Sequence, residues 1–276
     1  MKMRPSRILK KLRNGESVCT FKLNTESPRL AEIAAMSGFD GLWLCNEHGG
    51  NNWQTVENMI RAAKIYDVDT VVRVSRGSYS DYVRPLEMDA TGIMVPHIMS
   101  AQDARNLVKM TRFHPFGLRA LDGGNQDGAY CSVPQQDYLR DSNEQRFVIG
   151  QIEDPEAVKE LDEIAAVPGL DILLFGPGDF SHALGAPGDF THPKLIDARK
   201  RMVAACHEHG KFAATVGTLD NFAELLDMGF QYINIGSDVT SLGGVCRNTT
   251  SKFREEISKE SAKKSSNKKK VSSKIY

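Results

Sequence analysis

Four stretches of the sequence place polar side chains at the end of apolar runs, where they could take part in chemistry. In LWLCNEH, TVVRVS, VIGQIED and LLFGPGDFS these side chains are Glu47 and His48, Arg73, Gln151 and Glu153, and Asp179. Two carboxylates with water form the oxygen-rich donor set that Mg²⁺ or Mn²⁺ prefers. A metal beside an arginine can hold an α-keto acid and stabilise its enolate, and a histidine can move a proton near neutral pH. Together, these residue types indicate metal-assisted enolate chemistry.

These residues can act together only if the fold brings the ends of their strands to one place. Short apolar segments typical of buried parallel strands alternate with amphipathic segments over residues 17–238. The predicted strands are 18–23, 41–45, 70–75, 92–98, 146–152, 171–175, 211–216 and 232–236, and the clearest helices are 27–37, 53–66 and 101–110. Eight strand–helix units predict an α/β fold, a (β/α)8 TIM barrel with its reactive groups at the C-terminal strand ends. The alternation alone leaves a doubly wound sheet open.

Composition sets the limits on this fold. The chain has 276 residues, of which 41% are hydrophobic and 25% charged, so it can bury a large core and is not disordered throughout. No apolar run approaches the roughly 20 residues that cross a bilayer. The basic start, MKMRPSRILKKLRNG, is expected to form a short helix before the first strand. Five scattered cysteines without a C-x-x-C pair favour a reducing compartment, and we expect a cytoplasmic protein.

The end of the chain differs in composition from the rest. Residues 252–276 hold eight lysines and one arginine against three glutamates, a balance of +6, and the total charge is zero, so the remaining residues carry −6. We therefore predict one barrel domain over residues 1–258 and a disordered, Lys/Ser-rich tail over residues 259–276. Such a tail is expected to keep the protein in solution; contact with nucleic acid or an acidic partner is the alternative. Nucleic acid is otherwise an unexpected partner, because the acidic body offers no second basic surface.

The set of motifs is more specific than any one of them. SGFDGLWLCNEHGGNNWQT, VVRVS, GIMVPHIMSAQDAR, QIED and GPGDFS follow one another in an order and spacing that resembles the HpcH/HpaI aldolase/citrate lyase family. The resemblance runs from about residue 6 to residue 238. It implies a class II, divalent-metal-dependent pyruvate aldolase on a TIM barrel, similar to 4-hydroxy-2-oxoheptanedioate aldolase and 2-dehydro-3-deoxyglucarate aldolase.

The resemblance also implies roles for single residues. Glu153 and Asp179 would be the ligands of the divalent cation, which could be Mg²⁺, Mn²⁺ or Co²⁺. His48 would be the acid/base, and Arg73 would orient the pyruvyl group and stabilise the enolate. Gln151 and the backbone at Gly178 would contact the keto acid. Glu87, in RPLEMDATG, would support the histidine.

The implied reaction is the retro-aldol cleavage of a 4-hydroxy-2-oxo acid, such as a 2-keto-3-deoxy sugar acid, to pyruvate and an aldehyde through a metal-bound enolate. No Schiff-base lysine is expected at the strand ends. Three positions depart from the family pattern: Cys45 stands where a family Asp is common, Ala120 replaces a Gly in FGLRALDGGNQDG, and Glu87 is one methylene longer than the usual Asp. We expect Cys45 to be a small buried side chain rather than a nucleophile.

Other functions remain open from the sequence. One alternative is a CoA-ester lyase of the citramalyl or malyl type, and another is a barrel without catalysis that serves as a binding or assembly module. The expected partners are a small keto acid and an aldehyde, and the resemblance implies a homo-oligomer, often a hexamer. We expect His97 to be a packed, hydrogen-bonded histidine, and His207 and His209 to be placed by the dipole of a helix end.

Overall fold

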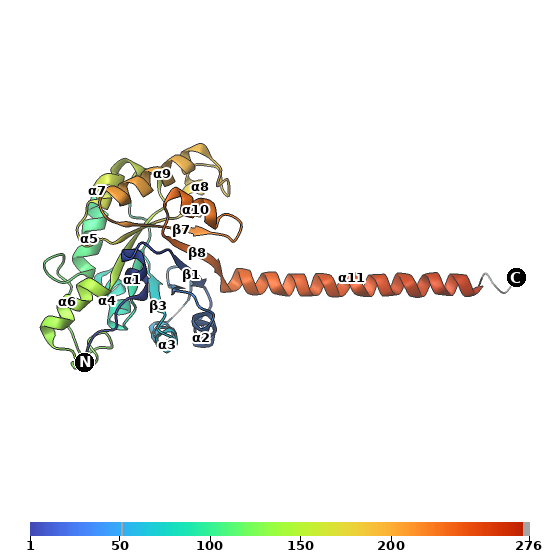
Figure 1. Cartoon of the computed structure of the whole chain (residues 1–276), viewed down its shortest axis with the longest axis horizontal. Coiled ribbons are helices and arrows are strands. Elements are labelled where there is room, and N and C mark those ends of the chain that lie inside the picture. The colour runs from blue at the N-terminus through green and yellow to red at the C-terminus, as the bar shows by residue number, and fades with distance from the viewer. Residues whose placement is uncertain (51, 273–276) are drawn as a thin grey trace.

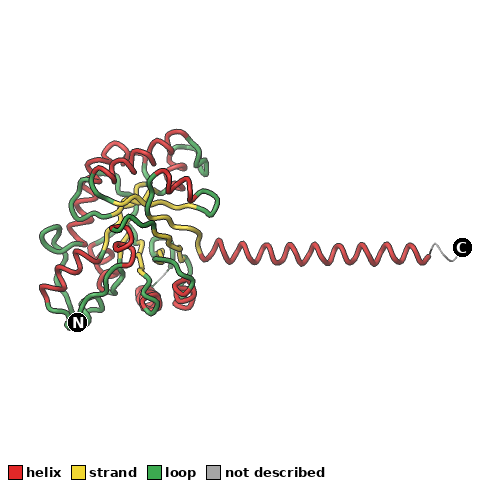
Figure 2. Tube along the Cα trace, in the orientation of Figure 1, coloured by secondary structure: helices red, strands yellow, loops and turns green. Residues whose placement is uncertain are grey.

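The structure is a computed structural model that describes residues 1–50 and 52–272. Eight parallel strands form a closed barrel, in which each strand pairs with the next and β8 pairs with β1 (Figure 1, Figure 2). The predicted TIM barrel is confirmed, and all eight predicted strands are present with ends shifted by a few residues at most. The strands are β1 (Val18–Leu23), β2 (Gly41–Cys45), β3 (Asp69–Arg73), β4 (Gly92–Val95), β5 (Phe147–Ile152), β6 (Ile172–Phe175), β7 (Phe212–Gly217) and β8 (Tyr232–Ser237).

Helices surround the barrel, as the amphipathic segments predict. Several begin where a side chain caps the first turn: Ser27 accepts a hydrogen bond from the Leu30 amide, and Ser100 accepts one from the Asp103 amide. The helices are α1 (Arg7–Arg13), α2 (Pro28–Met36), α3 (Trp53–Lys64), α4 (Tyr79–Glu87), α5 (Ala101–Thr111), α6 (Gln135–Gln145), the 3₁₀ helix η1 (Pro155–Glu160), α7 (Leu161–Ala165), α8 (Pro177–Ala183), α9 (Pro193–Glu208), α10 (Phe222–Met228) and α11 (Asp238–Ser272). None of the described helices is long and apolar enough to span a membrane.

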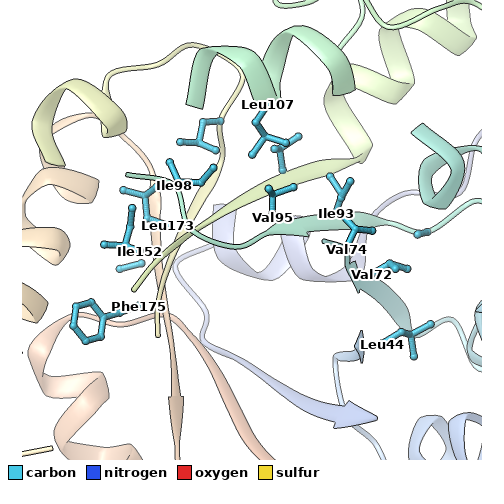
Figure 3. Packing of buried hydrophobic residues seen from close by; sticks show 14 of the residues in the cluster. Leu44, Val72, Val74, Ile93, Val95, Ile98, Leu107, Ile152, Leu173 and Phe175 are labelled. Atoms are coloured by element: carbon cyan, nitrogen blue, oxygen red, sulfur yellow. The ribbon is translucent and has the colours of Figure 1, made fainter. Parts of the chain in front are cut away.

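Two apolar layers hold these elements together. The outer layer lies between the strands and the helices, where residues such as Val95, Leu107 and Leu173 pack (Figure 3). The inner layer fills the barrel itself and includes Trp43 and Val71. Because alternate residues of each strand face these two layers, every strand of the barrel is apolar on both sides, which explains the continuous apolar runs.

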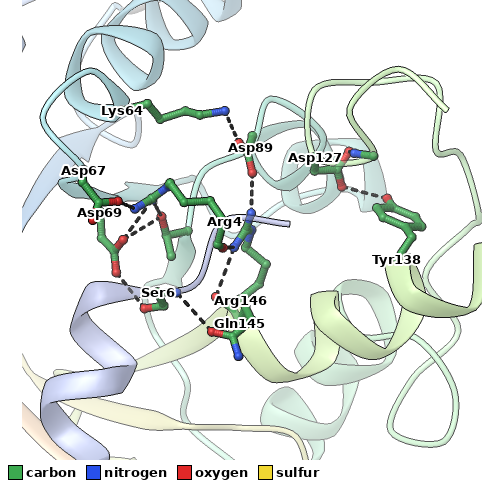
Figure 4. A network of polar contacts seen from close by, with 12 residues as sticks. Arg4, Ser6, Lys64, Asp67, Asp69, Asp89, Asp127, Tyr138, Gln145 and Arg146 are labelled. Atoms are coloured by element: carbon green, nitrogen blue, oxygen red, sulfur yellow. Dashed lines mark hydrogen bonds and ion pairs between the residues drawn. The ribbon is translucent and has the colours of Figure 1, made fainter. Parts of the chain in front are cut away.

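The N-terminal end of the barrel is closed. Three residues of α1, Ile8, Leu9 and Leu12, are at most 2% exposed and belong to the inner layer. Each contributes about 1.5–3 kcal/mol of burial free energy. In front of α1, Arg4 donates to the Asp69 carboxylate at 2.9 Å, and the Ser6 hydroxyl donates to the same carboxylate at 2.7 Å (Figure 4). This end is therefore built for stability, and the C-terminal end, here called the mouth, is where a barrel of this kind holds its reactive groups.

The C-terminal segment differs from the sequence-based prediction. In place of a disordered tail from residue 259, α11 continues without a break to Ser272 and projects from the barrel (Figure 1). The segment contains Ala, Lys, Glu and Arg and lacks Gly and Pro after Gly244, so its backbone favours helix once α11 has started. The last part of the predicted tail, residues 273–276, lies outside the described residues.

Candidate active site

Four strands bring polar side chains to the mouth. Trp43 and Val71 face the barrel interior, and two residues later β2 and β3 present Cys45 and Arg73 on the same side. On β5, Gln151 follows the interior residue Ile149 in the same way. The strand register thus places side chains from distant parts of the sequence in one layer at the C-terminal end.

Arg73 lies at the centre of this layer. It is 4% exposed, and its Nε lies 2.9 Å from Oε2 of Glu47. Its Nη2 donates to the sulfur of Cys45 at 3.1 Å, and its Nη1 reaches Oε1 of Gln151 at 3.5 Å. The guanidinium also lies over the ring of Trp43, 4.8 Å from the centroid. The arginine is therefore fixed in position before any ligand binds.

Glu153 lies beside this arginine at the end of β5. Its carboxylate accepts hydrogen bonds from the backbone amide of His97, at 3.1 Å, and from the side-chain amide of Gln151. Burial raises the pKa of Glu153 to about 7; the charge of His97 opposes this, and the carboxylate of Asp179 adds to it. Asp179, an exposed residue in the first turn of α8, is thus close enough to affect Glu153 electrostatically.

The donor set of this pair fits a divalent cation. Glu153 and Asp179 offer carboxylate oxygens from two different elements, which are the donors that Mg²⁺ and Mn²⁺ prefer. Their mutual repulsion disfavours the doubly ionised state in the absence of a cation, and a bound cation would remove this cost. The structure therefore brings together the two residues predicted to be metal ligands.

The turn between β6 and α8 is shaped around Glu153. A Cβ atom at Gly176 would lie 2.7 Å from Oε2 of Glu153 and 3.0 Å from Nε2 of Gln151. Only a glycine lets the backbone approach these two side chains so closely. Gly178, predicted to contact the keto acid through its backbone, lies in the same turn and is exposed.

The predicted acid/base residue lies at the rim of the mouth. The side chain of His48 is 62% exposed, and its Nε2 lies 3.6 Å from Oε2 of Glu47. Glu47, whose role the sequence left undefined, thus lies between His48 and Arg73. This places the histidine on the β2 side of the mouth, across from the carboxylate pair.

Glu87 does not join this group. It ends α4 on the outside of the barrel, and burial raises the pKa of its carboxyl group, with Arg119 acting in the opposite direction. Its backbone carbonyl accepts a hydrogen bond from Asp127, in the segment 113–134. Among the described residues, no hydrogen bond or ion pair links Glu87 to His48. Support of His48 by Glu87 therefore stays a prediction.

The long segment 113–134, which connects α5 to α6, is ordered in the structure. Arg119 and Asp127 form an ion pair at 2.7 Å, and the side chains of both are 1% exposed. The hydroxyl of Tyr138 donates to the same Asp127 carboxylate, also at 2.7 Å (Figure 4). A buried pair with this third partner holds the segment against α6.

Two residues of the mouth are missing from the sequence-based site. The backbone of His97 donates to Glu153, and its Nδ1 lies 2.9 Å from Oδ2 of Asp154. The predicted hydrogen bonding of His97 is confirmed, but the predicted close packing is not, because its side chain is 43% exposed. The second residue is Lys22 on β1, close to Trp43 and Arg73. That no lysine at the strand ends forms a Schiff base stays a prediction. Lys22 follows the buried residues Val18 and Thr20 at a spacing of two, so its side chain faces the same side of β1, and this spacing could have revealed it from the sequence.

A second group of possible ligands lies elsewhere. Ligand atoms of Asp162, Glu208 and His209 all lie within 4.8 Å of one another. Glu208 and His209 end α9 just before β7 begins, so this group is at the N-terminal end of the barrel, opposite the mouth. It is not the predicted metal site, and His209 lies at the helix end as expected.

Fold and site together define a (β/α)8 barrel with two carboxylates and a buried arginine at its mouth. The family model described as HpcH/HpaI aldolase/citrate lyase matches residues 20–243, and the chain belongs to this family. The predicted family is therefore confirmed, and with it the predicted activity class, a carbon–carbon lyase of the class II aldolase type.

Three relatives illustrate the similarity. The chain is 32% identical to a hydroxypyruvate/pyruvate aldolase of Delftia acidovorans, over 84% of this chain and 86% of the relative. It is 31% identical to a 4-hydroxy-2-oxo-heptane-1,7-dioate aldolase of Shigella flexneri, over 89% and 92% of the two chains. The crystal structure of an HpcH/HpaI aldolase from Desulfitobacterium hafniense superposes with a TM-score of 0.85 at 27% identity, covering 90% of this chain and 96% of that one.

Proposed function

We propose that this protein cleaves a 4-hydroxy-2-oxo acid to pyruvate and an aldehyde, and that it catalyses the reverse aldol addition as well. The observation that carries the proposal is the carboxylate pair of Glu153 and Asp179 in one mouth with the buried Arg73. The names of two relatives, a hydroxypyruvate/pyruvate aldolase and a 4-hydroxy-2-oxo-heptane-1,7-dioate aldolase, support the same activity, because both names refer to 2-oxo acids. These names favour an aldolase over the two alternatives, a CoA-ester lyase and a barrel without catalysis.

Glu153 and Asp179 are the proposed ligands of a divalent cation, Mg²⁺, Mn²⁺ or Co²⁺. When bound, such a cation polarises the keto group of the substrate and stabilises negative charge that develops on its oxygen. Gln151 donates to Glu153 and so fixes the orientation of this carboxylate. Gln151 and the backbone at Gly178 are also the proposed contacts to the keto acid.

The other residues act on the substrate directly. Arg73 pairs with the carboxylate of the keto acid and holds the three-carbon fragment in place. His48 accepts the proton of the C4 hydroxyl group, the C3–C4 bond breaks, and its electron pair forms the enolate of pyruvate while C4 becomes the aldehyde carbon. Return of a proton to C3 completes pyruvate. Support of His48 by Glu87 is also proposed, and it needs a contact that a single chain does not provide.

The activity is tested by exchange of the pyruvate methyl protons for deuterium, followed by proton NMR. Exchange should need added Mg²⁺, Mn²⁺ or Co²⁺ and should stop in EDTA. Glu153→Ala and Asp179→Ala should each lower the exchange rate by about 10²-fold or more, because each removes half of the charged donor set. Asp162→Ala, which changes the group at the opposite end of the barrel, is the matched control and should exchange at the wild-type rate. Exchange that continues unchanged in EDTA would exclude the proposed metal site.

We also propose a homo-oligomer, in which α11 provides a contact between copies. Val239, Leu242, Val245, Phe253 and Ile257 are all exposed on this projecting helix. At 100° per residue they fall on one side of it, as expected for an interface. A hexamer remains the proposed subunit count. The division into a barrel domain to residue 258 and a basic tail beyond it also stays a proposal.

A cytoplasmic location is proposed on the chemistry of the cysteines. The five cysteines form no disulfide in the part of the chain that the structure describes. Cys45 and Cys206 are buried, and a reducing compartment keeps such thiols intact.

A further inference from the structure

Lys22 is a mouth residue to which the proposed reaction gives no task. It lies on β1, a strand that pairs with β2 and β8 and is four strands away from β5 in the closed barrel. Its Nζ lies 5.0 Å from the centroid of the Trp43 ring, the same ring that Arg73 covers at 4.8 Å. Two cations therefore lie close to the same indole ring.

The two cations differ in their partners. Arg73 has a carboxylate at 2.9 Å, that of Glu47. In the described part of the chain, no carboxylate lies within ion-pair distance of Lys22. Asp238 is near enough to act on Lys22 through space, but its oxygens already accept from the backbone of Asn24, Thr25 and Val239.

Lys22 thus makes no close ion pair of its own in the described chain, although Glu47 and Asp238 act on it through space. Burial lowers the pKa of Lys22, Cys45 opposes this shift, and the charge of Arg73 adds to it. The ring of Trp43 compensates in part, because an ammonium group over an indole is attracted by its face. A ligand that carries a negative charge would supply the missing partner.

The proposed reaction decides which part of a substrate reaches this position. Its keto-acid half would lie beside Arg73 and the divalent cation that Glu153 and Asp179 would hold. The C4 hydroxyl must lie near His48, which follows β2, so the aldehyde half extends to the β2 side of the mouth. Lys22 pairs in register with Trp43 of β2, so it lies on the strand next to that half.

We propose that Lys22 binds an anionic group on the aldehyde half of the substrate, so that the preferred aldehydes carry a carboxylate or a phosphate. This inference rests on the proposed aldolase activity. The ammonium group pairs with the anion, and Trp43 holds the lysine stem in place. Lys22 is a specificity residue in this account, and it takes no part in the proton transfers.

The test compares aldehydes within each variant. Aldol addition of pyruvate is measured with glyoxylate, which carries a carboxylate, with glyceraldehyde 3-phosphate, and with the uncharged glycolaldehyde. Lys22→Met keeps an unbranched apolar stem over Trp43 but removes the charge. It should lower kcat/KM for a charged aldehyde, relative to glycolaldehyde, by at least tenfold, mainly through KM. The charged aldehyde with the larger change identifies the anion as carboxylate or phosphate.

Two further variants complete the design. Lys22→Arg restores a cation and should recover most of the preference, whereas Lys109→Met, on the exposed side of α5, should leave it unchanged. Because the readout is a ratio within one variant, partial unfolding does not imitate the effect. A ratio that changes less than twofold in Lys22→Met would overturn the inference.

Failure of the aldolase activity and failure of the role of Lys22 give different results. Wild-type protein that shows no metal-dependent exchange of pyruvate protons would refute the proposed function itself. Exchange that proceeds with an unaltered aldehyde preference in Lys22→Met would refute only the role of Lys22. Irreversible inactivation by borohydride in the presence of pyruvate, absent from Lys22→Arg, would also overturn that role, because it would show that the amine forms an imine with the keto acid.

Discussion

At the scale of single residues, the mouth is organised by the contacts of Arg73. The sulfur of Cys45 lies 3.1 Å from its guanidinium, at the position where the family often has a carboxylate. Burial would raise the pKa of Cys45, but Arg73, the backbone at His48 and Lys22 outweigh this, so its pKa is below the ordinary value. Glu47 is the carboxylate paired with Arg73.

A second residue, Asp238, links the mouth to α11. Its carboxylate accepts from the backbone amides of Asn24 and Thr25 at 2.9 Å and from that of Val239 at 2.8 Å. Burial alone would raise the pKa of Asp238, but these bonds and the Thr25 hydroxyl lower it below its ordinary value. Asp238 thus fixes the loop after β1 to the start of α11.

We predict that Asp238→Asn lowers the free energy of unfolding by about 1–2 kcal/mol at pH 7, because a neutral amide accepts these bonds more weakly. A lowered folded-state pKa stabilises the protein above the unfolded pKa of about 3.9, and this stabilisation is lost as the pH falls through the folded-state value. The difference between variant and wild type should therefore shrink near pH 3, as measured by urea unfolding. Asp162→Asn, on the exposed outside, should change little at either pH. An equal difference at pH 7 and pH 3 would show that the charge of Asp238 is not the cause.

At the scale of elements, the turn from β6 into α8 is the part of the fold most directly shaped by the site. Pro177 begins α8 and Asp179 lies in its first turn, so the helix start fixes one carboxylate of the pair. Gly176 lets the same turn approach Glu153 on the neighbouring strand β5. The separation of the two carboxylates is therefore set by backbone position rather than by flexible side chains.

Gly176→Ala should lower the metal-dependent exchange of pyruvate protons by at least tenfold. The added Cβ would lie 2.7 Å from Oε2 of Glu153 and 2.9 Å from its Cβ, so Glu153 or the turn must move. The barrel should stay folded, which circular dichroism can check. Gly123→Ala is the control, because a Cβ there meets nothing within 4 Å. Wild-type exchange in Gly176→Ala would mean that the position of Glu153 tolerates the shift.

At the scale of the whole molecule, α11 is the element that extends beyond the barrel. The helix contacts β1 and β8 at its start and then leaves the barrel (Figure 1). Leu242 and Phe253 are 62% and 66% exposed. A projecting helix with an apolar side is stable in water when another surface covers it, since most helical stability in proteins comes from packing. A second copy of the chain is the proposed cover.

Leu242→Glu and Phe253→Glu should each shift the protein to smaller species in sedimentation velocity, because a charge cannot be buried in an apolar contact without a partner. Ser251→Glu is the matched control: it lies about 180° from Leu242 around the helix and should leave the assembly intact. Truncation after Ser258 should also leave assembly and turnover unchanged, since the apolar side of α11 described above ends at Ile257. A single species of one chain in the wild type would refute the proposed oligomer.

Local sequence was sufficient to predict the scaffold and part of the site. Buried parallel strands are apolar on successive residues, so β1 to β8 could be located without knowledge of their neighbours. Glu153 and Asp179 directly follow such strands, and strand ends of a barrel meet at one mouth, so their proximity was also predictable. The same logic found Arg73 and Gln151.

The tertiary structure decided what depends on approach between distant segments. Lys22 lies at the mouth because the register of β1 against β2 places it over Trp43. Glu87 lies apart from the other predicted site residues because it ends α4, a helix outside the barrel. The contact of His97 with Glu153 runs through a backbone amide, which every residue except proline has and no motif marks. Sequence periodicity reports which face of a strand or helix is buried; the distance between two side chains depends on register and helix placement, which arise only when the whole barrel closes.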